Sequence, residues 1–259
     1  MKTENSYKAL TVLLAVLFIL SGCQKENSVE SPPRATLEIR FIPVINGQPL
    51  QLNQPYTNPF GETYSLSIFR FYAGRFSLGD QQSGLQKAVE GEPYYLPDLA
   101  DQNSMQIAMP VEPGIYDALA FILGVDSALN VSGVQSGVLD PARGMFWTWN
   151  SGYIFTKIEG NSTASSQPNG KFEYHVGGFK NPFSAIRPMV AQLTGTDKWI
   201  LGKDQTLHVD IAYDMNSFFD AHFPLRIAEN AVVMTPGELA MNISLNFAGA
   251  FEIVDYSIR

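Results

Sequence analysis

Short segments in which apolar and polar residues alternate constrain the fold of this chain more than any other feature. In residues 205–213, Leu207, Val209 and Ile211 alternate with polar residues, and residues 35–44 show the same pattern. A period of two is typical of a strand with one face in a core and the other toward solvent. We count about ten such segments, separated by turns rich in glycine, proline and asparagine. The pattern predicts an all-β protein, most simply a β-sandwich.

Other segments refine this prediction. Residues 115–125 are almost continuously apolar, which is typical of a central strand covered on both faces. Residues 64–72 form another predicted strand, with Leu66 and Ile68 on one face. Helical spacing is confined to short segments near the C-terminus, residues 215–220 (a turn is the alternative) and 238–247. With no internal repeat, we predict a single-domain β-sandwich with long aromatic-rich loops and at most short helices.

The first residues have the features of a bacterial export signal. Lys2 and Lys8 give a basic start, and the apolar run that follows is short for a membrane span. The run ends in Leu-Ser-Gly-Cys at Cys23, which resembles a lipobox, whose cysteine is lipidated and becomes the new N-terminus. An uncleaved N-terminal membrane anchor is the alternative.

These features divide the chain into three expected parts: a signal peptide of residues 1–22, a flexible tether of residues 23–34 and a folded domain of residues 35–259. The tether is polar and contains prolines, as flexible linkers do. Cys23 is the only cysteine, so the domain depends on its core and not on disulfides. The Gln-Lys-Glu that follows it is similar to the surface-export signal of Bacteroidetes lipoproteins. We therefore expect an outer-membrane lipoprotein, facing either the periplasm or the cell surface.

Charge and motifs narrow the function class. The formal net charge is −8 and no basic stripe is present, which argues against nucleic-acid binding. We find no nucleophile elbow, P-loop, dinucleotide-binding fingerprint or His-Glu-x-x-His motif. We therefore expect a protein that is not an enzyme.

An aromatic-rich stretch, residues 144–160, stands apart from the strand patterning. It contains Trp147 and Trp149, two of the three tryptophans, and follows a long irregular segment. Residues two apart in a strand face the same side, so both indoles could cap the core. A sugar-stacking platform is the alternative. Long loops in compact domains are usually functional, so we expect the specific function here.

Three histidines are candidate metal ligands, because imidazole suits copper or zinc. His175 shares a strand face with Glu173, and a solvent-facing histidine is the simpler interpretation. His208 lies on the polar side of its predicted strand, and His222 lies in a loop. Spacing alone does not show that the three converge.

Oxygen ligands occur on the long irregular segment as Asp126, Asn130 and Asp140. These residue types suit calcium, but they lack the dense alternation of an EF-hand loop. Asx-turns that structure the loop are the simpler interpretation.

From the aromatic stretch onward, the sequence resembles the MbnP-like family. The most specific part is Trp-Asn-Ser-Gly-Tyr from Trp149, followed by Lys-Ile-Glu-Gly from Lys157 and His-Val-Gly-Gly from His175. Asn-Pro-Phe-Gly from Asn58 and Leu-Asp-Pro from Leu139 support it. The resemblance covers nearly all of the expected folded domain.

The family consists of exported copper-binding proteins encoded beside relatives of di-haem peroxidases. In them a tryptophan is oxidised to kynurenine, whose aryl amine binds copper together with histidines. The resemblance therefore implies copper binding, with His175 as the matching histidine and Trp147 or Trp149 as the matching tryptophan. It also implies a di-haem peroxidase-like partner. No second histidine aligns with a family ligand, and His222 is a candidate outside the matching motifs.

Two functions are therefore open. The first is a lipid-anchored copper-binding protein; the second is a structural or interaction lipoprotein without metal, whose aromatic loop contacts a partner protein or glycan. The copper-binding hypothesis predicts that His175 lies close to a second metal-donor side chain and that both lie near the edge of a tryptophan ring. The interaction hypothesis predicts an exposed Trp147 or Trp149, with His175 remote or buried against a carboxylate.

Overall fold

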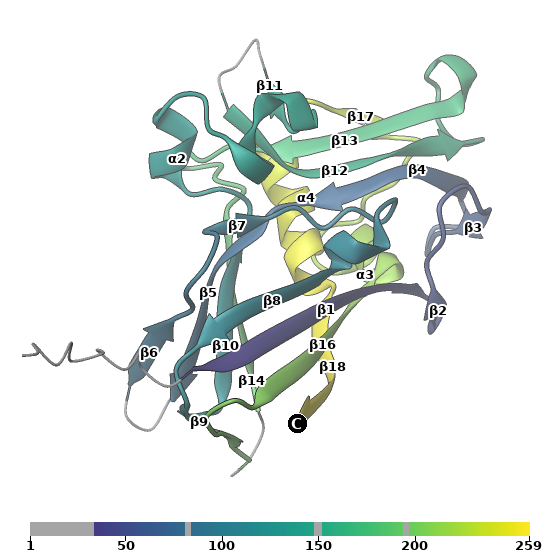
Figure 1. Cartoon of the computed structure of the whole chain (residues 1–259). Coiled ribbons are helices and arrows are strands. Elements are labelled where there is room, and N and C mark those ends of the chain that lie inside the picture. The colour runs from purple at the N-terminus through teal and green to yellow at the C-terminus, as the bar shows by residue number, and fades with distance from the viewer. Residues whose placement is uncertain (1–33, 81–83, 148–151, 194–196) are drawn as a thin grey trace, which may run out of the picture. The chain divides into compact units, whose positions relative to one another are not determined.

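Strands dominate the described part of the chain, in three larger sheets and one two-stranded sheet (Figure 1). The computed structural model describes residues 34–80, 84–147, 152–193 and 197–259, which belong to one compact unit. The predicted all-β, sandwich-like fold with short helices is confirmed. Cys23 with the expected signal peptide and tether, and Trp149, lie outside the described residues.

The first sheet is built around the N-terminal strand. Its order is β18-β16-β1-β2, and β8 also pairs with β1. The strands are β1 (Ala35–Ile45), β2 (Gln48–Pro49), β8 (Gln106–Val111), β16 (Thr206–Asp214) and β18 (Phe251–Ile258). β1 runs parallel to β16 and antiparallel to β8. In β16, Leu207, Val209 and Ile211 are buried, which confirms the predicted alternation.

The second sheet packs against the first, with Phe121 lying 6.3 Å from Phe41 of β1 between ring centroids. Its order is β14-β10-β5-β6, and β7 also pairs with β5. The strands are β5 (Ala73–Asp80), β6 (Leu85–Ala88), β7 (Tyr94–Tyr95), β10 (Ala118–Leu123) and β14 (Arg187–Gln192). The predicted central strand of residues 115–125 is confirmed only for β10, which lies between β14 and β5. The strand is interrupted at Asp117, and Ile115 before it belongs to a separate short strand and is exposed. A separate pair joins β9 (Gly114–Tyr116) to β15 (Trp199–Leu201).

The third sheet carries the aromatic stretch. Its order is β17-β13-β12-β4-β3, and β11 also pairs with β12. The strands are β3 (Tyr56–Thr57), β4 (Thr63–Phe71), β11 (Phe146–Trp147), β12 (Gly152–Ser162), β13 (Lys171–Gly177) and β17 (Val232–Val233). One face of β13 enters the core through Phe172, Tyr174 and Val176. The opposite face is available to a functional site.

Helices fill the space between the sheets and order the loops. The α-helices are α2 (Ser127–Val131), α3 (Met215–Asp220) and α4 (Glu238–Gly249), and the 3-10 helices are η1 (Gln102–Met105), η2 (Gly137–Leu139), η3 (Pro141–Arg143) and η4 (Pro168–Gly170). Phe247 of α4 packs on Phe71 of the third sheet and on Tyr213 of the first, with centroid distances of 5.3 and 5.0 Å. The helix predicted at residues 238–247 is confirmed, and residues 215–220 form a helix, not only a turn. No helix in the described ranges is long and apolar enough to cross a membrane.

A β-bulge overturns one detail of the strand prediction. Leu66 is fully buried, whereas Ile68 is half-buried and does not share its face. In the pairing of β4 with β12, Leu66 lies opposite Gly160 and Ile68 opposite Glu159, so Ser67 is an extra residue. The extra residue shifts the alternation by one, and a residue pattern alone does not reveal it.

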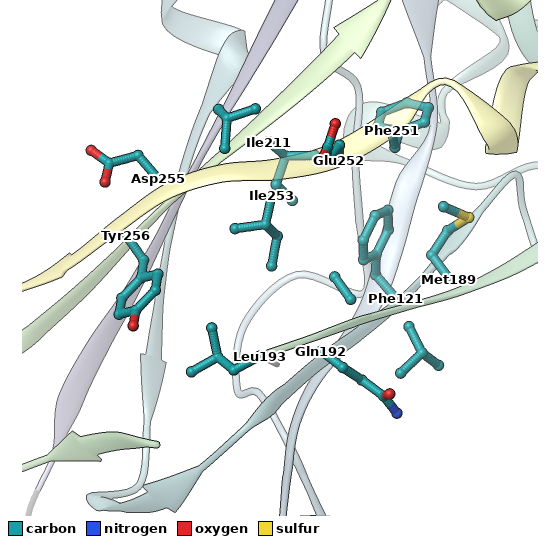
Figure 2. A pocket seen from close by; sticks show the side chains of 13 residues that line it. Phe121, Met189, Gln192, Leu193, Ile211, Phe251, Glu252, Ile253, Asp255 and Tyr256 are labelled. Atoms are coloured by element: carbon teal, nitrogen blue, oxygen red, sulfur yellow. The ribbon is translucent and has the colours of Figure 1, made fainter. Parts of the chain in front are cut away.

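The first two sheets stay open along one side, where the edge strands β14 and β18 border a groove of about 490 Å³. Figure 2 shows Phe121 and Leu193 on one side of this groove and Ile253 and Tyr256 on the other, whereas Asp255 points away. Apolar side chains make up much of the lining of this groove at the edge of the sandwich, and Gln192 and Glu252 also belong to it.

Glu62 connects parts of the chain that are far apart in sequence, which leads to a stability prediction. Its carboxylate accepts hydrogen bonds from the backbone N–H groups of Ile227 (2.8 Å) and Ala228 (2.9 Å) and from Nδ2 of Asn58 (2.7 Å). Glu62→Ala leaves these donors without their acceptor, and we expect the free energy of unfolding to fall by about 2–3 kcal/mol. Glu229→Ala removes an exposed carboxylate nearby and should cost less than about 0.5 kcal/mol. Urea unfolding measures both, and equal effects would contradict the role of Glu62.

Candidate metal centre

His175 lies on the face of β13 that points away from the core, as the alternation predicts. Its neighbours Tyr174 and Val176 are buried in the core on the opposite face. The simpler expectation of a solvent-facing side chain is wrong, because His175 is only 6% exposed. Lys157 Nζ donates to the carbonyl oxygen of Gly144 at 3.4 Å, which holds the start of the aromatic stretch beside this face.

Two glutamates lie close to the imidazole, and each of them pairs with a lysine. His175 Nε2 is 2.7 Å from Oε1 of Glu159, and the same oxygen is 3.3 Å from Lys157 Nζ. Glu173 Oε1 is 3.4 Å from Lys171 Nζ. One ligand atom from each of Glu159, Glu173 and His175 lies within 4.8 Å of the other two. It is the one group of three or more His, Cys, Asp or Glu side chains at such distances within the described ranges.

The surroundings fix the protonation of this group. Burial lowers the pKa of His175, and the positive charge of Lys157 lowers it further, against the effect of Glu159. Burial acts to raise the pKa of Glu159, but the hydrogen bond from His175 and the charge of Lys157 outweigh it and lower that pKa. At neutral pH a neutral imidazole therefore donates from Nε2 to an ionised carboxylate, and Nδ1 is its acceptor nitrogen. A carboxylate that orients a histidine in this way is common at metal sites.

Trp147 lies on the same face as His175. It pairs with Gly152 at the start of β12 and is buried. A Cβ atom added to Gly177 would lie 2.9 Å from Cζ3 and Cη2 of the indole, so the ring packs directly over this glycine. Gly177 follows His175 by two residues in β13 and therefore faces the same side. The structure thus brings one candidate tryptophan close to the candidate histidine.

Trp147 also borders a cleft of about 710 Å³. Phe146, Phe179 and Phe183 contribute to its lining, and the cleft opens beside the aromatic stretch. One edge of the indole is therefore close to a space from which a reagent or a partner could approach it.

The other histidines do not join His175. His208 Nδ1 is 3.1 Å from Oε2 of Glu38, in the first sheet. His222 lies beyond α3, and its Nε2 would be 3.0 Å from a Cβ added to Gly249 at the end of α4. The suggestion of His222 as a second ligand finds no support in this arrangement, because the carboxylates take the positions around His175.

The three candidate calcium ligands each stabilise local loop structure. Asp126 caps α2 through the N–H of Leu129, and its carboxylate pairs with Arg75 at 2.7 Å. Asn130 donates to the carbonyl of Val125 and accepts from the N–H of Tyr153, while Asp140 caps η3. This matches the loop-structuring alternative, and a calcium site has no support from these contacts.

Sequence reasoning missed Glu159 and Glu173 as candidate ligands. The signal that could have found them is a pair of polar residues on the outward face of each of two neighbouring strands. These are Lys157 and Glu159 on β12 and Glu173 and His175 on β13. Glu159 lies directly opposite Glu173, and Lys157 opposite His175. This register depends on a bulge between Ile154 and Thr156, which the residue pattern does not show.

These features define a class: a sandwich-like β-protein with a buried tryptophan close to a covered histidine–carboxylate group on an outer sheet face. The sequence model of the MbnP family matches residues 34–235. The chain therefore belongs to the MbnP family. The fold is similar to the solved structure of MbnP from Methylosinus trichosporium, with a TM-score of 0.53 and 16% sequence identity over 87% of this chain and 98% of that chain. No curated protein sequence matches this chain.

Proposed function

We propose that this chain is an exported, lipid-anchored copper-binding protein that uses His175 and an oxidised tryptophan as nitrogen donors. Membership of the MbnP family supports the copper role. The observation that carries the proposal is the packing of Trp147 over Gly177, two residues from His175 on the same strand face. The copper-binding hypothesis predicts that a tryptophan lies close to His175.

The residues fit copper in their donor chemistry. The neutral imidazole of His175 offers a lone pair, and the hydrogen bond to Glu159 fixes the ring. An indole is a poor ligand, whereas the aryl amine of kynurenine can bind a borderline metal. Copper held in this way is sequestered outside the cytoplasm, and the chain itself needs no catalytic group.

Oxidation of the indole requires a partner, and we propose a di-haem peroxidase-like enzyme. Two equivalents of hydrogen peroxide supply the two oxygen atoms that open the indole C2–C3 bond, and two water molecules are released. Hydrolysis of the resulting formamide then releases formate and leaves the aryl amine. The cleft that Trp147 borders gives a partner a route to the ring edge.

Anchoring at the outer membrane is part of the same proposal. The lipobox-like sequence at Cys23 and the polar tether after it support a lipid anchor. The described domain begins with β1 at Ala35, so a short tether would hold it near the membrane surface.

Intact mass and metal content of the protein from its native host test this proposal. We expect close to one copper per chain and the mass change of a tryptophan converted to kynurenine, mapped to the peptide that contains Trp147. A Trp147→Phe variant should lose the mass change and bind copper less tightly than the native protein, and should keep its fold by circular dichroism. An unmodified mass together with no copper uptake would reject the proposal.

A second candidate function is an interaction lipoprotein without metal. Val131, Val134 and Phe183 are exposed beside the cleft and could contact a partner. His175 is also buried against a carboxylate, as that hypothesis predicts. It also predicts an exposed Trp147 or Trp149. Trp147 is only 4% exposed, and Trp149 lies outside the described residues, so this part stays a prediction. The same copper measurement decides between the two functions.

A further inference from the structure

We infer that Glu159, Glu173 and His175 form a three-ligand site for a divalent cation, which binds Cu²⁺ more tightly than Zn²⁺. The inference deepens the proposed copper function and rests on it for the choice of copper. The family resemblance implied a histidine and a tryptophan as ligands, and the inference adds the two carboxylates. The resulting ligand set favours Cu²⁺ over Cu⁺. It does not require an oxidised tryptophan.

The hairpin of β12 and β13 fixes the three side chains relative to one another. Glu159 and Glu173 are direct cross-strand partners, and His175 is the next outward-facing residue of β13 after Glu173. Their ligand atoms already lie within 4.8 Å of one another. Nε2 of His175 donates to Glu159 in the metal-free protein, and it becomes a ligand when its proton moves to Nδ1. A metal ion with bonds of about 2.0–2.2 Å needs its ligands about 3–4 Å apart, so side-chain rotation suffices and the strands need not move.

The donor set selects a divalent ion. One imidazole nitrogen and two carboxylate oxygens are borderline and hard ligands, whereas Cu⁺ prefers soft thiolate and thioether sulfur. Among divalent first-row ions, Cu²⁺ binds nitrogen and oxygen ligands most tightly. Three protein ligands leave a coordination position open for water, or for an amine derived from Trp147.

The two lysines explain how the carboxylates remain stable without metal. Lys157 and Lys171 each lie within salt-bridge distance of one of the glutamates. The Lys171 side chain is 55% exposed and can turn into solvent when a cation arrives. The Lys157 side chain is 17% exposed and also bonds the Gly144 carbonyl, so it stays beside the site and opposes a second positive charge. Lys157 therefore weakens metal binding.

Cation binding by the full-length protein, purified in detergent from a host without the peroxidase partner, tests this inference. Competition titrations with Cu²⁺, Zn²⁺ and Cu⁺ should show Cu²⁺ as the tighter divalent ion. Each of Glu159→Gln, Glu173→Gln and His175→Gln should weaken Cu²⁺ binding by about a hundredfold. Lys157→Gln should tighten it by about fivefold, because a nearby positive charge is removed.

Glu112→Gln is the matched control. Glu112 forms a similar lysine–glutamate pair with Lys87 at 2.7 Å, and its loss should leave Cu²⁺ affinity unchanged. Thermal unfolding of every variant separates a lost ligand from a lost fold. Cu²⁺ affinity weaker than about 100 μM, or equal affinity in the three ligand variants and the control, would overturn the inference. If the native protein nevertheless held copper on an oxidised tryptophan, the proposed function would stand without this ligand set.

Discussion

Gly177→Ala is expected to remove Trp147 from its place beside His175 and to lower the free energy of unfolding by about 3 kcal/mol. A Cβ at this position would lie 2.4 Å from the backbone carbonyl oxygen of Tyr153 and 2.9 Å from the indole. The carbonyl belongs to the paired strand β12 and cannot move independently, so the strand spacing and the ring both have to change. One methyl group therefore alters both the third sheet and the candidate metal centre.

Two measurements check this expectation. Urea unfolding gives the stability change, and the indole N–H resonance of Trp147, assigned with Trp147→Phe, reports the position of the ring. Gly202→Ala is the control, because its added Cβ would meet only the flexible end of the Gln205 side chain at 2.8 Å. An unshifted Trp147 resonance in the Gly177 variant would mean that the ring does not pack as described.

Asn246→Ala is expected to lower the free energy of unfolding by about 4 kcal/mol, the larger of these two stability effects. Asn246 on α4 is fully buried, and its Oδ1 accepts from the N–H groups of His222 and Phe223, both at 2.8 Å. Its Nδ2 donates to the carbonyls of Phe218 at 2.9 Å and of Phe223 at 2.6 Å. Alanine leaves all of these backbone groups buried without their partner, and the connection between α3 and α4 loosens.

Asn242→Ala makes the same substitution one turn earlier on α4, at a half-buried position, and should cost less than about 1 kcal/mol. Chemical denaturation of both variants gives the comparison. Hydrogen exchange of the His222 and Phe223 amides should accelerate in the Asn246 variant alone. A similar loss of stability in the two variants would show that the helix surface, and not this amide, holds the connection.

The strands of this fold could be predicted from sequence, whereas their arrangement could not. Alternation in residues 205–213 predicted β16 because each side chain there responds to a core on one side and water on the other. The parallel pairing of β16 with β1 has no local signal, since the two strands are far apart in the chain. The extra residues Ser67 in β4 and Phe155 in β12 shift the alternation by one position, and a single extra residue leaves no mark on composition.

The candidate metal centre was predictable only in part, because alternation within a strand is a local signal and the register between strands is not. His175 was identified by family resemblance, and its face followed from the alternation of β13. Glu159 and Glu173 become neighbours only through cross-strand register, which the sequence does not state. The burial of His175 was not predictable, because residues from a separate segment, beginning at Gly144, lie beside it.

The place of β1 in the first sheet has a consequence for the order in which the chain can fold. β1 lies between β8 and β16, and Arg40 pairs with Asp210 across 170 residues of sequence. Synthesis from the N-terminus makes β1 early and β16 late, so this pairing has to wait until most of the polypeptide has been made. Contacts of such long range close slowly. The first sheet is therefore completed late in folding, and until then the uncovered apolar face of β1 is a place where the chain can aggregate.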